Sequence, residues 1–135
     1  MSLPQLRVVA AVLYDPQWRV LIAQRPPGKP LAGYWEFPGG KLAEGEDEAA
    51  ALRRELSEEL GIEVQTSRPL LMLAHDYSDR RVLLAVHVVE QYLGVPRGLE
   101  GQPLKWVSPA VLFGEDLLPA DRPIVEALNR EAAAR

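Results

Sequence analysis

The stretch that decides the fold is GGKLAEGEDEAAALRRELSEELGI, residues 39–62. It opens with two glycines, passes through an acidic loop and continues into a run of good helix formers that Gly61 stops. Asp47 has the side chain of an N-cap, and Glu46 and Glu48 beside it suit the positive end of a helix dipole. A helix is therefore predicted over residues 49–60.

The predicted helix has an apolar stripe and an acidic arc. The stripe should face the core and consists of Ala49, Leu52, Leu56 and Leu60. Residues three and four apart share a face, so the adjacent arc consists of Glu55, Glu58 and Glu59. Like charges at these spacings repel by roughly 0.2–0.5 kcal/mol per pair. A hard cation such as Mg²⁺ or Mn²⁺ would relieve that repulsion.

For the three glutamates alone, a solvated acidic face is the simpler interpretation, because carboxylates at helical spacing are common. Two neighbouring features favour a metal site. Gly39 and Gly40 lie just before the helix, where glycine lets the backbone approach a ligand closely. Arg54 lies four residues before Glu58 and can hold that carboxylate in place.

Composition narrows the class of protein. The 135 residues suit one compact domain, residues 1–135, and a hydrophobic content of 47% is enough for a core. A net charge of -4 disfavours a nucleic-acid polymer as partner. A small anionic substrate remains compatible, because a divalent metal reverses the local sign of a carboxylate-rich pocket. The chain has no cysteine, which excludes disulfides, zinc–thiolate sites and thiol nucleophiles.

The sequence lacks a signal-peptide pattern and any apolar run long enough to span a membrane. A cytoplasmic protein without a membrane partner is expected. The oligomeric state is left open, and a monomer is compatible with the sequence.

Hydrophobic patterning predicts an α/β domain with a mixed sheet between two helices. Residues 7–14 and 18–24 are predicted to form a β-hairpin, followed by a loop over residues 25–33 and a short strand over residues 34–37. The remaining elements are strands over residues 62–66, 70–77, 81–89 and 104–107 and a C-terminal helix over residues 123–134.

Nine positions fit one fixed pattern, G-x5-E-x7-R-E-U-x-E-E-x-G-U, where U is a bulky aliphatic residue. They are Gly40, Glu46, Arg54, Glu55, Leu56, Glu58, Glu59, Gly61 and Ile62. The chain therefore resembles the Nudix hydrolases of the MutT type, and the number of specified positions makes the match specific. Residues 35–41, residues 100–103 with Trp106, and residues 119–123 also resemble segments of these enzymes.

The resemblance implies the Nudix fold, an α/β/α sandwich around a mixed sheet. It also implies magnesium-dependent attack by water at phosphorus, expected at the β-phosphorus, which splits a nucleoside triphosphate into a monophosphate and pyrophosphate. The implied metal ligands are the carbonyl of Gly39 and the carboxylates of Glu55, Glu58, Glu59 and Glu100. Lys41 and Arg54 would orient this machinery, and either Glu55 or Glu100 would be the general base. Bound metal suits this chemistry, because it neutralises phosphate charge and activates water.

The resemblance also implies a set of substrate-binding residues: Arg25, Phe37, Tyr77, Asp79, Arg80 and Asp121. Simpler interpretations remain open for most of them. Arg25 could be a solvated arginine at a strand end, Phe37 could belong to the core, and residues 78–80 could form a hairpin turn. His87 alternates within an apolar strand and is interpreted as a packed histidine.

Asp121 bears on the choice of base, because the best-known oxidised-guanine enzymes of this type have asparagine there. An amide can donate to O6 of 8-oxoguanine and accept from its N7–H, whereas an ionised aspartate only accepts. Aspartate suits an exocyclic amine, as in cytosine, unless burial keeps it protonated. A sanitising enzyme for 8-oxo-dGTP is the first hypothesis and a CTP or modified-dCTP pyrophosphohydrolase the second. A third is a non-catalytic nucleotide-sensing module, but such modules typically lose the box carboxylates that this chain retains.

Overall fold

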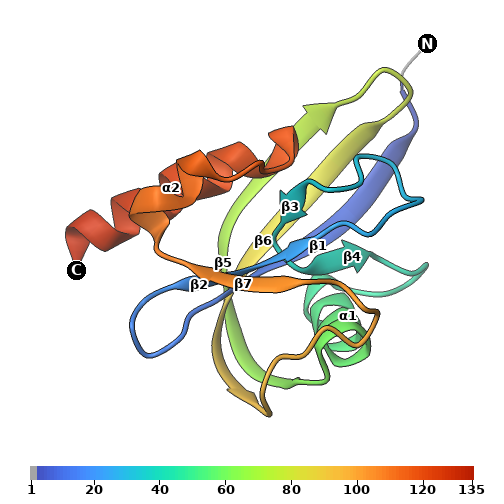
Figure 1. Cartoon of the computed structure of the whole chain (residues 1–135). Helices are drawn as coiled ribbons and strands as arrows, with labels where there is room; N and C mark the ends of the chain where they lie inside the picture. The colour runs from blue at the N-terminus through green and yellow to red at the C-terminus, as the bar shows by residue number, and fades with distance from the viewer. Residues whose placement is uncertain (1–2) are drawn as a thin grey trace.

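Residues 3–135 fold into two β-sheets and two α-helices (Figure 1). The computed structural model describes residues 3–135, so Met1 and Ser2, which the predicted domain includes, lie outside the described residues. The larger sheet is mixed and has the strand order β4-β1-β6-β5. Its strands are β4 (Gly39–Lys41), β1 (Gln5–Leu13), β6 (Arg81–Leu93) and β5 (Glu63–Asp76). β1 and β6 run parallel, and the other pairs are antiparallel.

The smaller sheet is antiparallel and has the order β3-β2-β7. Its strands are β3 (Trp35–Glu36), β2 (Val20–Gln24) and β7 (Leu104–Val107). Two short 3₁₀ helices, η1 (Pro109–Gly114) and η2 (Pro119–Asp121), follow β7 and lead into the last helix.

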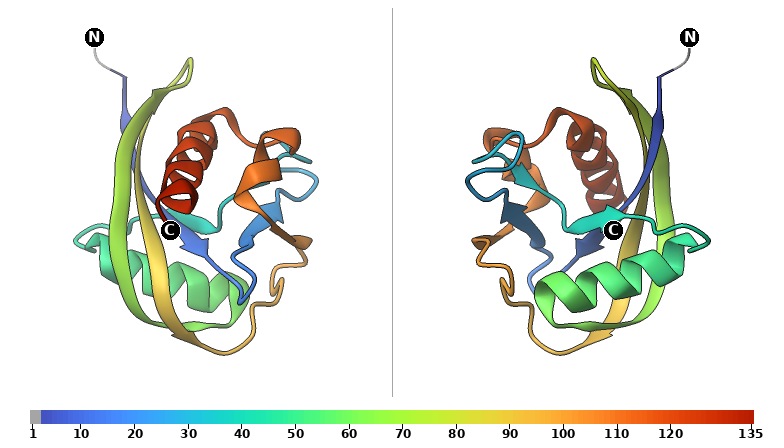
Figure 2. Two further views of the ribbon diagram at one scale, coloured as in Figure 1. Left: turned by 90° about the vertical axis from the view of Figure 1, so that its left-hand side faces the viewer. Right: turned by 90° about the vertical axis from the view of Figure 1, so that its right-hand side faces the viewer.

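The mixed sheet lies between helix α1 (Glu48–Leu60) on one face and helix α2 (Arg122–Ala134) on the other (Figure 2). The smaller sheet lies on the α2 side. The sequence of β1 is apolar without alternation because both faces of this strand are buried. Val9 and Ala11 pack in the cluster with α1, whereas Ala10 and Val12 pack in the cluster with α2. The α/β/α sandwich expected from the sequence is confirmed.

Helix α1 begins one residue earlier than predicted, at Glu48, and the predicted caps are confirmed. The side chain of Asp47 accepts a hydrogen bond from the N–H of Ala50 at 2.7 Å. Gly61 ends the helix in the left-handed conformation, with φ of 70°. Leu52, Leu56 and Leu60 are fully buried against the mixed sheet, although Ala51 rather than Ala49 completes the buried stripe.

The predicted hairpin of residues 7–14 and 18–24 is wrong, because its two strands belong to different sheets. β1 pairs with β4 and β6, and β2 pairs with β3 and β7. A single bridge between Tyr14 and Val20 joins them at the turn. Both strands are apolar on both faces, so the sequence pattern did not determine which neighbour each one pairs with.

The strands predicted over residues 62–66 and 70–77 form one strand, β5, of 14 residues. Its register shifts between Val64 and Thr66, between Thr66 and Ser67, and between Pro69 and Leu71. Proline is tolerated here because β5 is an edge strand and the ladder is irregular beside Pro69. β6 likewise extends to Leu93, four residues past the predicted end at residue 89.

Gly39 and Gly40, which follow the short strand predicted over residues 34–37, lie in a strand of their own, β4, and pair with β1. This pairing places the glycine pair immediately before the loop that leads into α1. Neither α-helix in the described part of the chain is long and apolar enough to cross a membrane.

Candidate active site

Most of the predicted site residues line one cleft with a volume of about 630 Å³. They come from the loop after β2, from the segment between β3 and β4, from β4, from α1, from the β5–β6 turn, from the loop before β7 and from η2. The predicted residues that line it are Arg25, Phe37, Gly39, Lys41, Glu55, Glu59, Tyr77, Arg80, Glu100 and Asp121. Its size suits a nucleotide, since small-molecule sites typically measure roughly 300–1,000 Å³.

Four glutamates line the cleft, and we call them the acidic group: Glu36, Glu55, Glu59 and Glu100. Burial of Glu59, together with the charges of its three neighbours, raises the pKa of Glu59 to about 8. A hydrogen bond from the backbone N–H of Gly39 opposes this rise. Glu59 also lies in the last turn of α1, at the negative end of the helix dipole, and that turn contains no basic residue.

The acidic group has the chemistry of a site for a hard divalent cation. Its donors are carboxylate oxygens, which Mg²⁺ and Mn²⁺ prefer, and a cation would offset the repulsion among them. Within residues 3–135, no three carboxylate or imidazole side chains already converge closely enough to hold an ion. Glu55 and Glu58 form ion pairs with Arg54, with N–O distances of 3.0 and 3.4 Å, so both side chains would have to leave Arg54 to coordinate an ion.

Each of the two glycines of β4 lies against a group that a side chain would displace. A Cβ atom at Gly39 would collide with the backbone carbonyl of Val9, so Gly39 is required for the pairing of β4 with β1. A Cβ atom at Gly40 would collide with the carboxylate of Glu55. Gly40 therefore lets this carboxylate lie directly against the backbone of β4.

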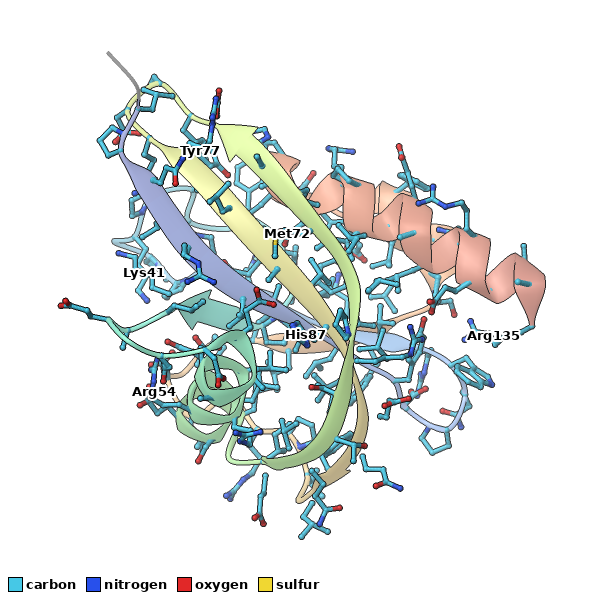
Figure 3. The ribbon with its side chains drawn as sticks, turned by 180° about the vertical axis from the view of Figure 1, so that it is seen from behind. Lys41, Arg54, Met72, Tyr77, His87 and Arg135 are labelled. Carbon is cyan, nitrogen blue, oxygen red and sulfur yellow. The ribbon has the colours of Figure 1, made fainter. Side chains whose placement is uncertain are left out.

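Arg54 joins the loop before α1 to the helix (Figure 3). Its guanidinium donates to both carboxylate oxygens of Glu46, at 2.8 and 2.9 Å, and to the carbonyl of Lys41, at 3.0 Å. The bonds from Arg54 to Glu46, with one from the N–H of Ala43, lower the pKa of Glu46 to about 2. The predicted contact with Glu58 is present but is the longest of the set. Arg54 lies outside the cleft and acts on it by holding Glu55.

Two predicted residues, Glu58 and Asp79, do not line the cleft. The side chain of Glu58 is 58% exposed and points to Arg54. Asp79 is exposed in the turn that joins β5 to β6, where the N–H of Tyr77 donates to the carbonyl of Arg80 at 2.8 Å. The hairpin-turn interpretation is therefore correct for Asp79, whereas Tyr77 and Arg80 on either side of it reach the cleft.

A second set of cleft residues, which we call the aromatic group, consists of Phe37, Tyr77, Arg80 and Asp121. Phe37 is 3% exposed, so it belongs to the core and also forms part of the cleft wall. The guanidinium of Arg80 lies 5.7 Å from the centre of the Tyr77 ring. Its Nε is buried and has no hydrogen-bond partner among the described residues. This group combines aromatic surface with polar atoms that a base edge could use.

Asp121 is buried, with 5% exposure, and its Oδ2 accepts a hydrogen bond from the N–H of Phe37 at 3.0 Å. Burial raises the pKa of Asp121 to about 7, and the charge of Glu36 adds to the rise. The N–H of Phe37 and the charge of Arg25 oppose it. Asp121 therefore has access to both protonation states near neutral pH.

Glu36 is a site residue that the sequence did not reveal. Its charge acts on Glu59 in the acidic group and on Asp121 in the aromatic group. Burial raises its own pKa, although Arg25 donates to it at 2.9 Å. Arg25 also donates to the carbonyl of Pro30 at 2.8 Å, so it is held at the cleft rather than solvated at a strand end. A charged residue between Trp35 and Phe37 in an otherwise apolar strand was the available signal.

His87 is packed, as predicted. It is 7% exposed within the mixed sheet, and its Nε2 lies 3.0 Å from a carboxylate oxygen of Glu48 at the start of α1 (Figure 3). It does not line the cleft that holds the predicted site residues.

Residues 9–127 match the family described as the NUDIX domain, which covers the glycine pair, α1 and most of the cleft. The chain belongs to the Nudix family. It is a MutT-type hydrolase that acts on nucleoside triphosphates, and the interpretation as a non-catalytic module is set aside. Family members of this kind generally need a divalent metal, and the acidic group supplies suitable ligands for one.

Two relatives from Escherichia coli K12 align with this Nudix domain over nearly its whole length. The 8-oxo-dGTP diphosphatase is 34% identical over 126 residues, which are 93% of this chain and 98% of that protein. The CTP pyrophosphohydrolase is 38% identical over 130 residues, which are 96% of each chain. The solution structure of the E. coli ORF135 protein is 38% identical and has a TM-score of 0.86, covering 98% of this chain and 94% of that one.

Alanine substitutions at the two glycines should differ in their effects on stability and on turnover. Gly39→Ala should lower the free energy of unfolding by about 1–3 kcal/mol, because the new methyl group meets backbone. Gly40→Ala should leave stability nearly unchanged and lower turnover, because the methyl group displaces the Glu55 carboxylate. Urea unfolding and pyrophosphate release test both variants. Equal stability losses without a difference in turnover would contradict this account of Gly40.

Proposed function

We propose that this Nudix hydrolase converts 8-oxo-dGTP, as its first substrate, into the nucleoside monophosphate and pyrophosphate with Mg²⁺ or Mn²⁺. The observation that carries the proposal is that one cleft contains both the acidic group and the aromatic group. The first suits a metal–triphosphate and the second suits a base.

The proposed metal ligands are the Gly39 carbonyl and the carboxylates of Glu55, Glu58, Glu59 and Glu100. A bound divalent ion would neutralise charge on the phosphate oxygens and lower the pKa of the attacking water. Glu55 or Glu100 would accept the proton of that water, since both line the cleft. Lys41 also lines the cleft and would orient the phosphates. Arg25, held by Glu36 and the Pro30 carbonyl, would contact the substrate as a preorganised donor.

The aromatic group supports recognition of an oxidised purine. Phe37 and Tyr77 offer ring surface for a base, and the buried Nε–H of Arg80 is a free donor among the described residues. Asp121 in its protonated state can both donate and accept a hydrogen bond, as an asparagine amide does. The 8-oxoguanine edge needs this combination, because it presents N7–H and the O6 acceptor.

Cytosine nucleotides are the second candidate, and the chemistry of Asp121 favours them when it is ionised. A carboxylate accepts a hydrogen bond from the N4 amine of cytosine. The O6 atom of 8-oxoguanine cannot donate such a hydrogen bond. The similarity to the CTP pyrophosphohydrolase supports this alternative, as the similarity to the 8-oxo-dGTP diphosphatase supports the first. The direct experiment measures kcat/KM with Mg²⁺ for 8-oxo-dGTP, dGTP, CTP and 5-substituted dCTP. A higher value for CTP than for 8-oxo-dGTP at neutral pH would overturn the first assignment.

Glu58 tests the proposed metal site, because its side chain must leave Arg54 to become a ligand. Glu58→Gln should lower kcat by about 10²-fold, the scale of losing one electrostatic contribution to a transition state. The melting temperature should change little, since this carboxylate is largely exposed. Glu63→Gln, an exposed glutamate on β5, is the matched control. Near-normal turnover of Glu58→Gln at saturating Mg²⁺ would remove Glu58 from the ligand set.

Asp121→Asn tests the base assignment, because the amide supplies a donor at every pH. Wild-type kcat/KM for 8-oxo-dGTP should fall as pH rises through about 7, while kcat/KM for CTP should rise. The charged or titratable groups that act on Asp121 are Glu36, Arg25 and Tyr77. The variant should lose this dependence and favour 8-oxo-dGTP by roughly tenfold to a hundredfold at high pH. Identical substrate rankings and pH profiles would show that Asp121 does not contact the base.

Stability provides an independent check of the same carboxyl group. Its pKa is raised from 3.8 to about 7 on folding, so its contribution to stability is complete below pH 3.8 and is lost as pH rises toward about 7. The free energy of unfolding of the wild type should therefore fall relative to that of Asp121→Asn across this window. Asparagine keeps the acceptor for the N–H of Phe37. A constant difference between the two proteins from pH 4 to about pH 8 would contradict the raised pKa.

A further inference from the structure

The loop between β6 and β7 covers the C-terminal end of α1. The last carbonyls of a helix have no partners within the helix, and this loop supplies partners for two of them. The N–H of Arg97 donates to the carbonyl of Leu60, and the N–H of Leu99 donates to the carbonyl of Glu59, both at 3.0 Å. The next residue in the loop is Glu100, so the loop brings a carboxylate to the end of the helix that carries Glu59.

The side chain of Gln102 joins these two glutamates through their backbones. Its Oε1 accepts from the N–H of Glu100 at 2.9 Å, and its Nε2 donates to the carbonyl of Glu59 at 3.1 Å. We call this pair of hydrogen bonds the Gln102 bridge. One partner can only donate and the other can only accept, so a carboxylate or an ammonium could satisfy only one of them. An amide of this length satisfies both.

Backbone hydrogen bonds hold the loop on both sides of Glu100, from the N–H of Leu99 to Glu59 and from the N–H of Gly101 to Gly98, and the Gln102 bridge adds the contact of Glu100 itself. Glu100 and Gly101 are exposed, whereas Gln102 is partly buried. Glu59 and Glu100 line the same cleft, and like charges in one cleft repel each other. Gly98 lets the loop fold tightly, since a Cβ atom there would collide with the backbone carbonyl of Gln102.

We propose that Gln102 is a positioning residue, which fixes the Glu100 loop against the end of α1 so that Glu59 and Glu100 face the same metal. Glu100 lies on a loop and Glu59 on a helix, and the bridge sets their relative position before a cation arrives. The positioning role rests on the proposed function, because it requires Glu100 to be a metal ligand. The bridge itself is a property of the metal-free protein.

Amide hydrogen exchange in the metal-free protein tests the bridge without reference to activity. Gln102→Met keeps the length of the side chain and removes both hydrogen bonds. Exchange of the Glu100 amide should become about tenfold faster, as expected for the loss of one hydrogen bond. Gln65→Met is the control, because it makes the same substitution at an exposed position on β5. Unchanged exchange at Glu100 in Gln102→Met would overturn the proposal.

Mn²⁺ affinity, measured by electron paramagnetic resonance, tests the positioning role. Gln102→Met should weaken binding about threefold to tenfold, the coupling expected between residues in one hydrogen-bonded network. In a Glu100→Gln background the same substitution should have almost no further effect, because there is no carboxylate left to position. Additive effects, or faster exchange with unchanged Mn²⁺ affinity, would show that Gln102 has only a structural role. If Glu100→Gln alone leaves affinity and turnover unchanged, the ligand role of Glu100 fails, and the positioning role fails with it.

Discussion

Repulsion among the carboxylates near the end of α1 determines how the segments around the cleft are arranged. Glu55, Glu59 and Glu100 share one cleft with Glu36, and the last turn of α1 adds the negative end of a helix dipole. This arrangement costs stability, because partly buried like charges are desolvated and repel one another. Proteins accept such local conflicts at functional sites. A divalent cation would offset this repulsion, so the carboxylates that repel one another would favour binding of the cation and of the phosphates that it coordinates.

Several features of the fold serve to keep these carboxylates together. The core cluster around Leu52 and Leu56 fixes α1 on the sheet, and Gly40 leaves room for the carboxylate of Glu55. Arg54 holds Glu55 from one side and joins the preceding loop through Glu46. The Gln102 bridge holds the Glu100 loop at the other end of the helix. Most of these interactions are local to α1 and its flanking loops, which explains why a short sequence pattern identifies the family.

The parts of the fold that the sequence predicted are those set by local chemistry. Asp47 and Gly61 marked the ends of α1, and the stripe that includes Leu56 marked its buried face. Strand pairing was less accessible, because β1 and β2 are apolar on both faces and their periodicity does not choose a neighbour. β5 was divided in two because Pro69 lies inside it, and only its position at the edge of the sheet makes that proline acceptable.

In the site, too, features set by local sequence were predictable and features set by tertiary structure were not. The carboxylates of α1 were predictable from helical spacing, whereas Glu36 required knowledge of how β3 lies between the acidic and aromatic groups. The burial of Asp121 also depends on tertiary structure, since η2 brings it beneath the N–H of Phe37, a residue 84 positions away in the chain. Asp79 lies outside the cleft lining, because residue type does not show which side chains of a turn face a cleft.

The number of protons released when Mg²⁺ binds tests whether the acidic group is a cation site. At about pH 7 the Glu59 carboxyl is mostly protonated without metal, because its pKa is about 8, and a ligand must be ionised. Titration calorimetry in buffers of different ionisation enthalpy should detect close to one proton released per Mg²⁺ at about pH 7, and almost none above about pH 9. Mg²⁺ binding without proton release at about pH 7, or no binding at all, would contradict the account.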